Sequence, residues 1–67
     1  MHLNLADLPT FYVIGRCSKG SRHYSKGMSY EDALAIMPKY ISVVDYFGGG
    51  TVDLVNWDGV VLKHKKV

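Results

Sequence analysis

The side chains in this sequence that offer chemistry are one cysteine, three histidines and six carboxylic acids. Cys17 and His23 are the one pair that would supply a thiol nucleophile and a base. The hairpin register predicted below places them on opposite faces of neighbouring strands, where the hydrogen bond of a thiolate pair does not form. The histidines (His2, His23 and His64) and the acids lack the paired spacing of metal ligands. We therefore expect no catalytic residues, no metal and no cofactor.

A chain of 67 residues has room for a single small domain with a thin core. We expect so small a domain to enclose no ligand pocket of about 300 Å³ or more, which also argues against an enzyme. The composition, 48% apolar and 21% charged, is typical of globular proteins. A lone cysteine excludes an internal disulfide, and no apolar run approaches the roughly 18 residues of a membrane span. The start of the chain lacks the pattern of a signal peptide, so we expect a soluble, cytoplasmic protein without a membrane partner.

A helix that begins after Ser29 is the element around which the chain is organised. The Ser29 hydroxyl is placed to accept a hydrogen bond from the amide of Asp32, and the acids Glu31 and Asp32 suit the first turn. Pro38 disfavours helical geometry in the residue before it, so we predict a helix over 29–38, with a kinked helix that continues to Tyr40 as the alternative. Its apolar residues recur at spacings of three and four, which predicts one stripe on a sheet: Tyr30, Ala33, Leu34 and Met37, with Ile41 as a further candidate.

Strand-like segments lie on both sides of this helix. Residues 10–17 are rich in aromatic and β-branched types, and Lys19-Gly20 suits a tight turn, so 10–26 is predicted as a hairpin. Its expected cross-strand pairs are Cys17 with Arg22, Arg16 with His23, and Gly15 with Tyr24. On that register Tyr12, Ile14, Arg16 and His23 share one side.

The second half of the chain is predicted to add three strands. Residues 41–47 are β-branched and aromatic, which favours a strand, with continuation of the helix as the alternative. The three glycines at 48–50 indicate a loop; a phosphate cradle needs a following Lys-Ser or Lys-Thr and a helix. Asp58-Gly59 predicts a second hairpin. Its expected pairs are Trp57 with Val60, Val55 with Leu62, and Asp53 with His64, the last as a modest ion pair.

Together these segments predict an α+β fold: a small antiparallel sheet of about five short strands in the order β-β-α-β-β-β, with one helix packed on one face. The lead-in, residues 1–9, is expected to pack on an edge of the domain. Strands are expected within 41–66. The thin core also leaves room for a homodimer, formed through exposed sheet or through residues 41–47.

The net charge of +2 is small, but the cations are clustered. Arg16 to Lys26 contains no acid, and the chain ends on Lys63-His64-Lys65-Lys66. This distribution predicts separate basic and acidic regions, either as a solvated rim or as a binding surface. The candidate partner-binding residues are the exposed aromatics and the clustered bases: Tyr12, Arg16, Lys19, Arg22, His23, Lys26, Trp57, Lys63, Lys65 and Lys66.

The stretch Tyr24-Ser25-Lys26-Gly27-Met28-Ser29 joins a short strand to a capped acidic helix that is followed by further strands. This arrangement resembles very small phage proteins that inhibit host enzymes, such as the uracil-DNA glycosylase inhibitors and the compact inhibitors of bacterial RNA polymerase. The glycosylase inhibitors resemble acidic DNA mimics, whereas this chain is net positive. The resemblance therefore implies a class, the non-catalytic inhibitor that acts by docking, and transfers neither the target nor any functional residue.

Two functions are consistent with the sequence. In the first, the protein docks on a partner protein with an acidic surface through exposed aromatics, steered by the basic residues. In the second, the same bases grip phosphates while Tyr12, Tyr24 or Trp57 stack on bases of a nucleic acid. No aromatic-rich RNA-binding consensus is present, so the first function is the expected one.

Overall fold

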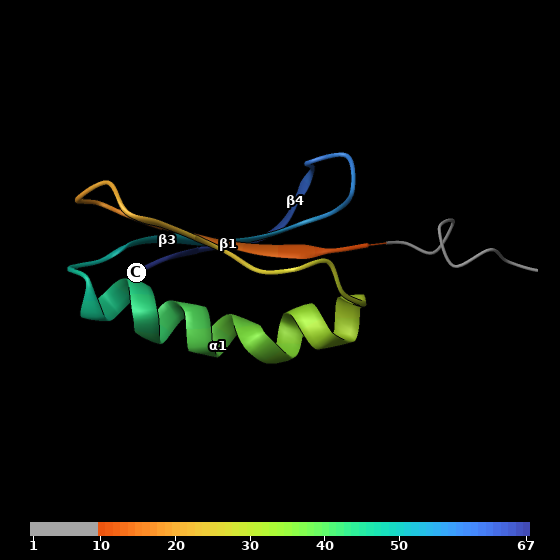
Figure 1. Ribbon diagram of the computed structural model, residues 1–67, viewed down its shortest axis with the longest axis horizontal. Helices are drawn as coiled ribbons and strands as arrows, with labels where there is room; N and C mark the ends of the chain where they lie inside the picture. Colours follow the sequence, from red (N-terminus) through yellow and green to blue (C-terminus); the bar gives the residue numbers. More distant parts are fainter. Residues whose placement is uncertain (1–9) are drawn as a thin grey trace, which may run out of the picture.

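The computed structural model describes residues 10–67, which form one helix and four strands (Figure 1). The elements are β1 (Tyr12–Cys17), β2 (Arg22–Tyr24), α1 (Tyr30–Tyr46), β3 (Gly50–Val55) and β4 (Val61–Lys66). The predicted α+β class is confirmed, with four strands between residues 10 and 67 in place of about five. The predicted lead-in, residues 1–9, lies outside the described part of the chain.

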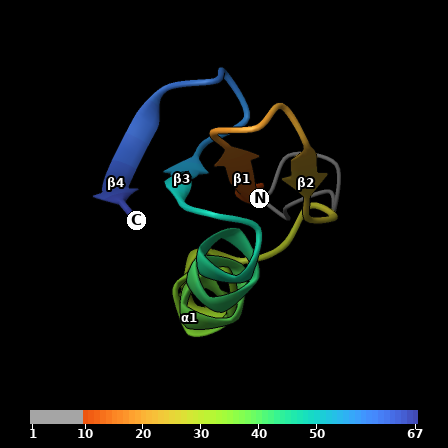
Figure 2. The same ribbon diagram turned by 90° about the vertical axis from the view of Figure 1, so that its left-hand side faces the viewer.

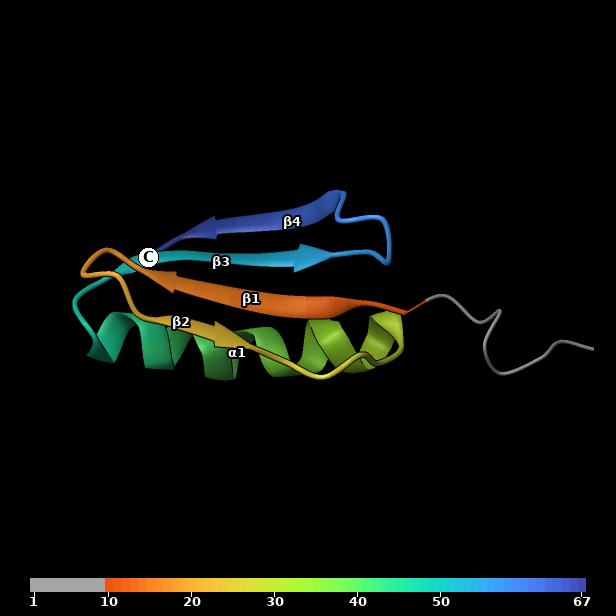
Figure 3. The same ribbon diagram turned by 45° about the horizontal axis from the view of Figure 1, so that its top comes forward.

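The sheet has the strand order β2-β1-β3-β4, and every neighbouring pair is antiparallel (Figure 3). Its centre is the pairing of β1 with β3, which runs without a break from Tyr12 opposite Val55 to Cys17 opposite Gly50. The second strand of each hairpin lies outside this pair: β2 lies beside β1, and β4 lies beside β3. Within residues 10–67, β2 and β4 are therefore the edges of the sheet.

The helix packs on one face of the sheet, below β1 and β3 (Figure 2). The core between the two layers contains Val13, Cys17, Val52 and Leu54 from the sheet and Ala33, Met37 and Val44 from the helix. The opposite face, which we call the outer face, is the one that α1 does not cover (Figure 2). This arrangement confirms the prediction of one helix on one sheet face.

The helix begins as the sequence predicts. Ser29 is the N-cap, with φ −66° and ψ 161°, and its Oγ accepts a hydrogen bond from the Asp32 amide at 3.2 Å. Glu31 and Asp32 lie in the first turn, where the helix dipole stabilises negative charge.

The helix does not end near Pro38, as predicted, but continues through it to Tyr46. The predicted strand over 41–47 is therefore wrong, and the alternative of helical continuation is correct. The reason is tertiary: Met37 and Val44 are buried and Ile41 packs against the core, a spacing that only a helix delivers to one face. Pro38 is exposed, so its ring meets solvent rather than the sheet.

The β1–β2 hairpin has a register one residue away from the predicted one. Arg16 lies opposite Arg22, Gly15 opposite His23 and Ile14 opposite Tyr24. The loop holds three residues instead of two: the Gly20 amide donates to the Cys17 carbonyl at 2.9 Å, and the Cys17 amide donates to the Ser21 carbonyl at 2.8 Å. Gly20 supplies the positive φ, +104°, that such a loop needs at its third position. The extra loop residue moves His23 to the helix side of the sheet.

The β3–β4 hairpin also has a loop of three residues, which is closed by Asn56 and Val60. Gly59 supplies the positive φ, +81°. The predicted pair Trp57 with Val60 is therefore wrong. Val55 pairs with Val61 rather than with Leu62. A bulge between Leu54 and Val55 then shifts the register by one residue in the opposite direction, and the predicted pair Asp53 with His64 is confirmed.

The glycines at 48–50 join α1 to β3, as the predicted loop requires. The amides of Gly48 and Gly49 donate to the carbonyls of Asp45 and Val44 at 3.0 and 2.9 Å and close the end of the helix. Gly50 is already the first residue of β3.

Candidate functional site

The outer face brings together two of the predicted contact residues from β1 and one from β2. The side chains of Tyr12 and Arg16 alternate with core residues along β1, and Arg22 faces Arg16 from β2. Tyr24, which is 61% exposed, completes this cluster. Two guanidinium groups placed directly opposite each other repel, so the sheet needs a compensating anion close by.

Asp53 on β3 supplies that anion. Its Oδ2 accepts a hydrogen bond from Arg16 Nη1 at 2.8 Å, and its Oδ1 lies 2.5 Å from His64 Nδ1. Asp53 is only 5% exposed, whereas the side chains of Arg16 and His64 are 46% and 57% exposed and cover it from either side. A buried carboxylate with both oxygens paired is a satisfied structural group. It also means that the charge of Arg16 is largely compensated.

Lys19 and Lys26 lie apart from this cluster. Lys19, in the β1–β2 loop, is directed at the end of the helix, because its Cε lies 3.5 Å from where a Cβ on Gly48 would stand. Lys26 is exposed in the connection from β2 to α1. The structure therefore does not unite all the predicted bases on one face.

His23 is the predicted contact residue whose place differs most from expectation. The observed register points it toward the helix, where its ring stacks on Phe47 with centroids 5.4 Å apart and an angle of 23°. Its Nε2 is buried and has no hydrogen-bond partner among the described residues. Cys17, buried in the core, points to the same face of the sheet, so the prediction of opposite faces is wrong. No hydrogen bond joins these two side chains.

The remaining predicted residues belong to the second hairpin and to β4. Trp57 is 56% exposed, while one edge of its indole contacts the ring of Phe11, with centroids 5.7 Å apart. Every residue of β4 is exposed. Lys63 and Lys65 pair with the core residues Leu54 and Val52 and therefore lie on the helix side of the strand, whereas Lys66 lies on the outer side. Cations thus occupy both faces of this edge.

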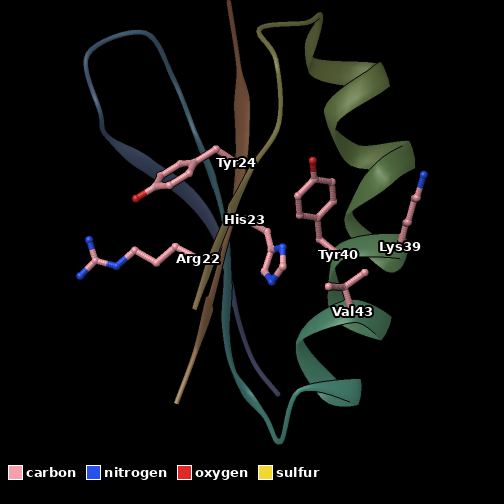
Figure 4. Close-up of a pocket in the computed structure, with 6 residues that line it drawn as sticks. All are labelled: Arg22, His23, Tyr24, Lys39, Tyr40 and Val43. Atoms are coloured by element: carbon pink, nitrogen blue, oxygen red, sulfur yellow. The ribbon is translucent and has the colours of Figure 1, made fainter. Parts of the chain in front are cut away.

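A groove of about 430 Å³ lies between β2 and α1 (Figure 4). The small size of the domain led us to expect no ligand pocket of about 300 Å³ or more, and this groove exceeds that volume. All three residues of β2 line one side, and one stretch of the helix lines the other: Arg22, His23, Tyr24, Lys39, Tyr40 and Val43. Figure 4 shows His23 directed toward Tyr40, with Arg22 and Tyr24 on the other side of β2.

The wall residues Lys39, Tyr40 and Val43 were not among the predicted contact residues. They belong to the segment around and after Pro38, and only continuation of the helix places them beside β2. The lining contains two cations and no carboxylate. Arg22 is directed to the outer side of β2, away from the helix (Figure 4), so its charge is offered on the outer face rather than inside the groove.

No group of three metal-ligating side chains gathers anywhere between residues 10 and 67. The helix in this part of the chain lacks the length and the apolar character needed to cross a membrane. Comparison with protein families, with curated proteins and with solved structures finds no match for this chain. The geometry of the surface is thus the basis for the functional proposal.

Proposed function

We propose that this protein is a non-enzymatic module that docks on the acidic surface of a partner protein. The observation that carries the proposal is the apolar tip of the β3–β4 hairpin, defined here by four exposed side chains: Trp57, Val60, Val61 and Leu62. An exposed apolar cluster of this kind on a small domain marks a contact surface. Tryptophan is also the residue type most enriched at the energetic centre of protein interfaces.

The indole of Trp57 is held in place before any partner binds. Its edge-to-face contact with Phe11 is continued by a second one, between Phe11 and Tyr30, with centroids 5.3 Å apart. The three rings connect the hairpin tip to the first turn of α1. A side chain fixed in this way loses little conformational entropy on binding, which favours affinity.

Charge supports an acidic partner. The hairpin tip leads directly into the basic strand β4, whose Lys63, Lys65 and Lys66 are exposed. The acids of the helix, Glu31, Asp32 and Asp45, lie in the other layer. A basic strand beside an apolar anchor accelerates encounter with an acidic surface and orients it.

A module of this type inhibits by covering a surface that its partner needs. Because residues 24–29 resemble the small phage-encoded inhibitors, we propose a host enzyme as the class of partner, either RNA polymerase or a repair or defence enzyme. The proposed compartment is the cytoplasm in which such enzymes work.

Affinity capture from a bacterial lysate treated with nuclease tests the proposal. We expect one stoichiometric protein to be retained, and Trp57→Ala to weaken its retention at least about tenfold, as loss of an interface anchor does. Tyr46→Ala is the matched control, because Tyr46 is 84% exposed at the far end of α1. Thermal unfolding of each variant verifies that the fold is intact.

A second variant tests the hairpin tip without removing the contact between Trp57 and Phe11. Val60→Asp places a charge in the hairpin tip at a side chain that is half exposed and is not part of the core. Retention that survives both Trp57→Ala and Val60→Asp would contradict docking through the hairpin tip.

One observation favours nucleic acid as a second candidate partner. Tyr12 and Tyr24 are exposed on the outer face near two arginines, and aromatic rings beside cations provide stacking platforms for bases. The ion pair of Arg16 with Asp53 weakens this case, because it leaves less charge for phosphates. Titration with single-stranded RNA and DNA decides the matter: micromolar binding that weakens steeply with salt and is lost in Tyr24→Ala would favour nucleic acid.

A further inference from the structure

We propose that β2 and the groove beside it accept an extended, acidic segment of the partner protein as a fifth strand of the sheet. The inference rests on the proposed function, since it assumes a protein partner, and it names where and how a segment of that partner binds. The occupant is a stretch of about five residues in which acidic and apolar side chains alternate, paired antiparallel to β2.

The backbone of β2 has hydrogen-bonding groups along its outer edge that no strand within residues 10–67 pairs with. In an antiparallel pair, successive residues direct their N–H and C=O groups alternately toward the neighbour and away from it. The bonds from Cys17 to Ser21 and from Ser25 to Val13 fix the inward-pointing positions at 21, 23 and 25. Arg22 and Tyr24 therefore turn their N–H and C=O groups to the outside, where none of the strands in residues 10–67 pairs with them.

The groove has the shape that such a segment requires. One wall is the edge strand itself, and the other is the face of α1 formed by Lys39, Tyr40 and Val43. Alternate side chains of an added strand point to opposite faces of the sheet. Those on the inner side would meet His23, Tyr40 and Val43, an apolar and aromatic floor (Figure 4). Those on the outer side would lie beside Arg22.

The charges of the groove select the occupant. Arg22 offers its charge on the outer side of β2 (Figure 4), Lys39 belongs to the helix wall, and no carboxylate is among the lining residues. The buried, unpartnered Nε2 of His23 adds a polar group at the floor that a ligand or a water molecule is free to satisfy. In an alternating segment, acids on the outer side would lie beside Arg22, and apolar residues on the inner side would lie over Tyr40 and Val43.

The other edge of the sheet lacks these features. The strand β4 carries Lys63, Lys65 and Lys66, and lysines on an edge oppose the addition of a further strand. No wall of the groove comes from β4. The same lysines oppose pairing of two copies through β4, whereas β2 contains no lysine.

The test uses the full chain and the blocked peptide acetyl-Glu-Val-Glu-Val-Glu-amide. We expect it to bind and, at saturation, to slow hydrogen exchange of the Arg22 and Tyr24 amides at least about tenfold, as new strand hydrogen bonds do. The charge-reversed peptide acetyl-Lys-Val-Lys-Val-Lys-amide is the control and is expected to leave both amides unchanged. Binding of the acidic peptide without protection of these two amides would overturn the proposal.

Methylation of the peptide backbone tests the strand geometry itself. In the proposed pairing the glutamates lie opposite Arg22 and Tyr24 and direct their amides to β2, while the valines direct theirs to solvent. N-methylation of the central glutamate is therefore expected to weaken binding about tenfold or more, and N-methylation of a valine to have little effect. Equal sensitivity at both positions would indicate attraction of charge without strand pairing.

A pair of variants locates the groove. Val43→Trp fills it with an indole and is expected to weaken peptide binding about tenfold, whereas Ser42→Trp puts the same side chain on the neighbouring exposed position and is expected to leave it unchanged. Sedimentation of the free protein tests a second copy as occupant, and a dimer that protects the Arg22 and Tyr24 amides would overturn the proposal.

The result is separable from that of the proposed function. Retention of the partner that depends on Trp57 but not on Val43→Trp would reject the β2 site and keep the docking function. Peptide binding at β2 without capture of any protein would keep the β2 site and reject the docking function.

Discussion

Val44 of the helix packs directly on Gly15 at the centre of β1. A Cβ built on Gly15 would lie 2.9 Å from Val44 Cγ2 and 3.7 Å from Tyr40 Cδ2. Gly15 thus lies directly beneath the second half of α1, beyond Pro38, and has no room for a Cβ. Val44 itself is fully buried. This contact connects the continuation of the helix to a glycine that lies twenty-nine residues earlier in the chain.

Gly15→Ala is expected to destabilise the protein by about 1–3 kcal/mol, because a well-packed core does not accommodate the added methyl group. The double variant Gly15→Ala with Val44→Ala should lose less than the sum of the two single losses, since the second change makes room for the first. Urea unfolding of the three variants measures the coupling. Additive losses would show that the two residues do not press on each other.

Asp53→Asn is expected to lower the free energy of unfolding by about 1–2 kcal/mol, a value reduced by the exposure of both partners. The neutral side chain leaves Arg16 and Arg22 opposed without an anion. The loss should shrink in about 1 M salt, where the screening length is roughly 3 Å. Asp58→Asn in the hairpin loop is the matched control, and it should leave stability unchanged. A loss that is independent of salt would mean that packing, not charge, holds Asp53.

Pro38→Ala is expected to stabilise the protein by roughly 1–3 kcal/mol, because proline inside a helix lacks the N–H that the carbonyl of Leu34 would accept. Pro38 is exposed, so the change removes no core contact. Ser42→Ala, also exposed on α1, should gain only about 0.5 kcal/mol from helix propensity. Thermal unfolding compares the two, and an unchanged Tm for Pro38→Ala would show that the helix has already adapted to its proline.

Replacement of Lys63, Lys65 and Lys66 by glutamine is expected to slow association with the captured partner about tenfold or more at low salt. Stability should change by less than about 0.5 kcal/mol, since all three side chains are exposed. Surface plasmon resonance across a range of salt concentrations separates the two rates. If dissociation rather than association changes, the lysines contact the partner instead of steering it.

Local signals in the sequence were sufficient for several features of this fold. The Ser29 cap, the strand at 12–17 and the glycine-containing loops of both hairpins are encoded within a few neighbouring residues. The cap and the positions of the two loops depend on short-range hydrogen bonds and backbone angles, which the residue types indicate, whereas the length of each loop was predicted one residue too short. The pair Asp53 with His64 was also predicted, although by a route that the structure revises: a loop one residue longer is cancelled by a bulge.

The candidate groove, by contrast, could not be predicted from the sequence. Its far wall is the part of α1 that follows Pro38, where the β-branched run at 41–44 favours a strand on local grounds. Its near wall includes His23. The predicted hairpin register was wrong by one residue and therefore placed His23 on the outer face. A single residue in a loop reverses the side of every residue that follows in the strand.

The amino-acid sequence by itself determined the class of this protein, its capped helix and its two hairpins, because each depends on contacts between residues close in the chain. The tertiary structure alone decided where the helix ends, which way His23 faces and that a groove opens beside β2. Those choices depend on burying Ile41 and Val44 against strands that lie far from them in sequence, and the free energy of that burial exceeds the local cost of a proline within the helix.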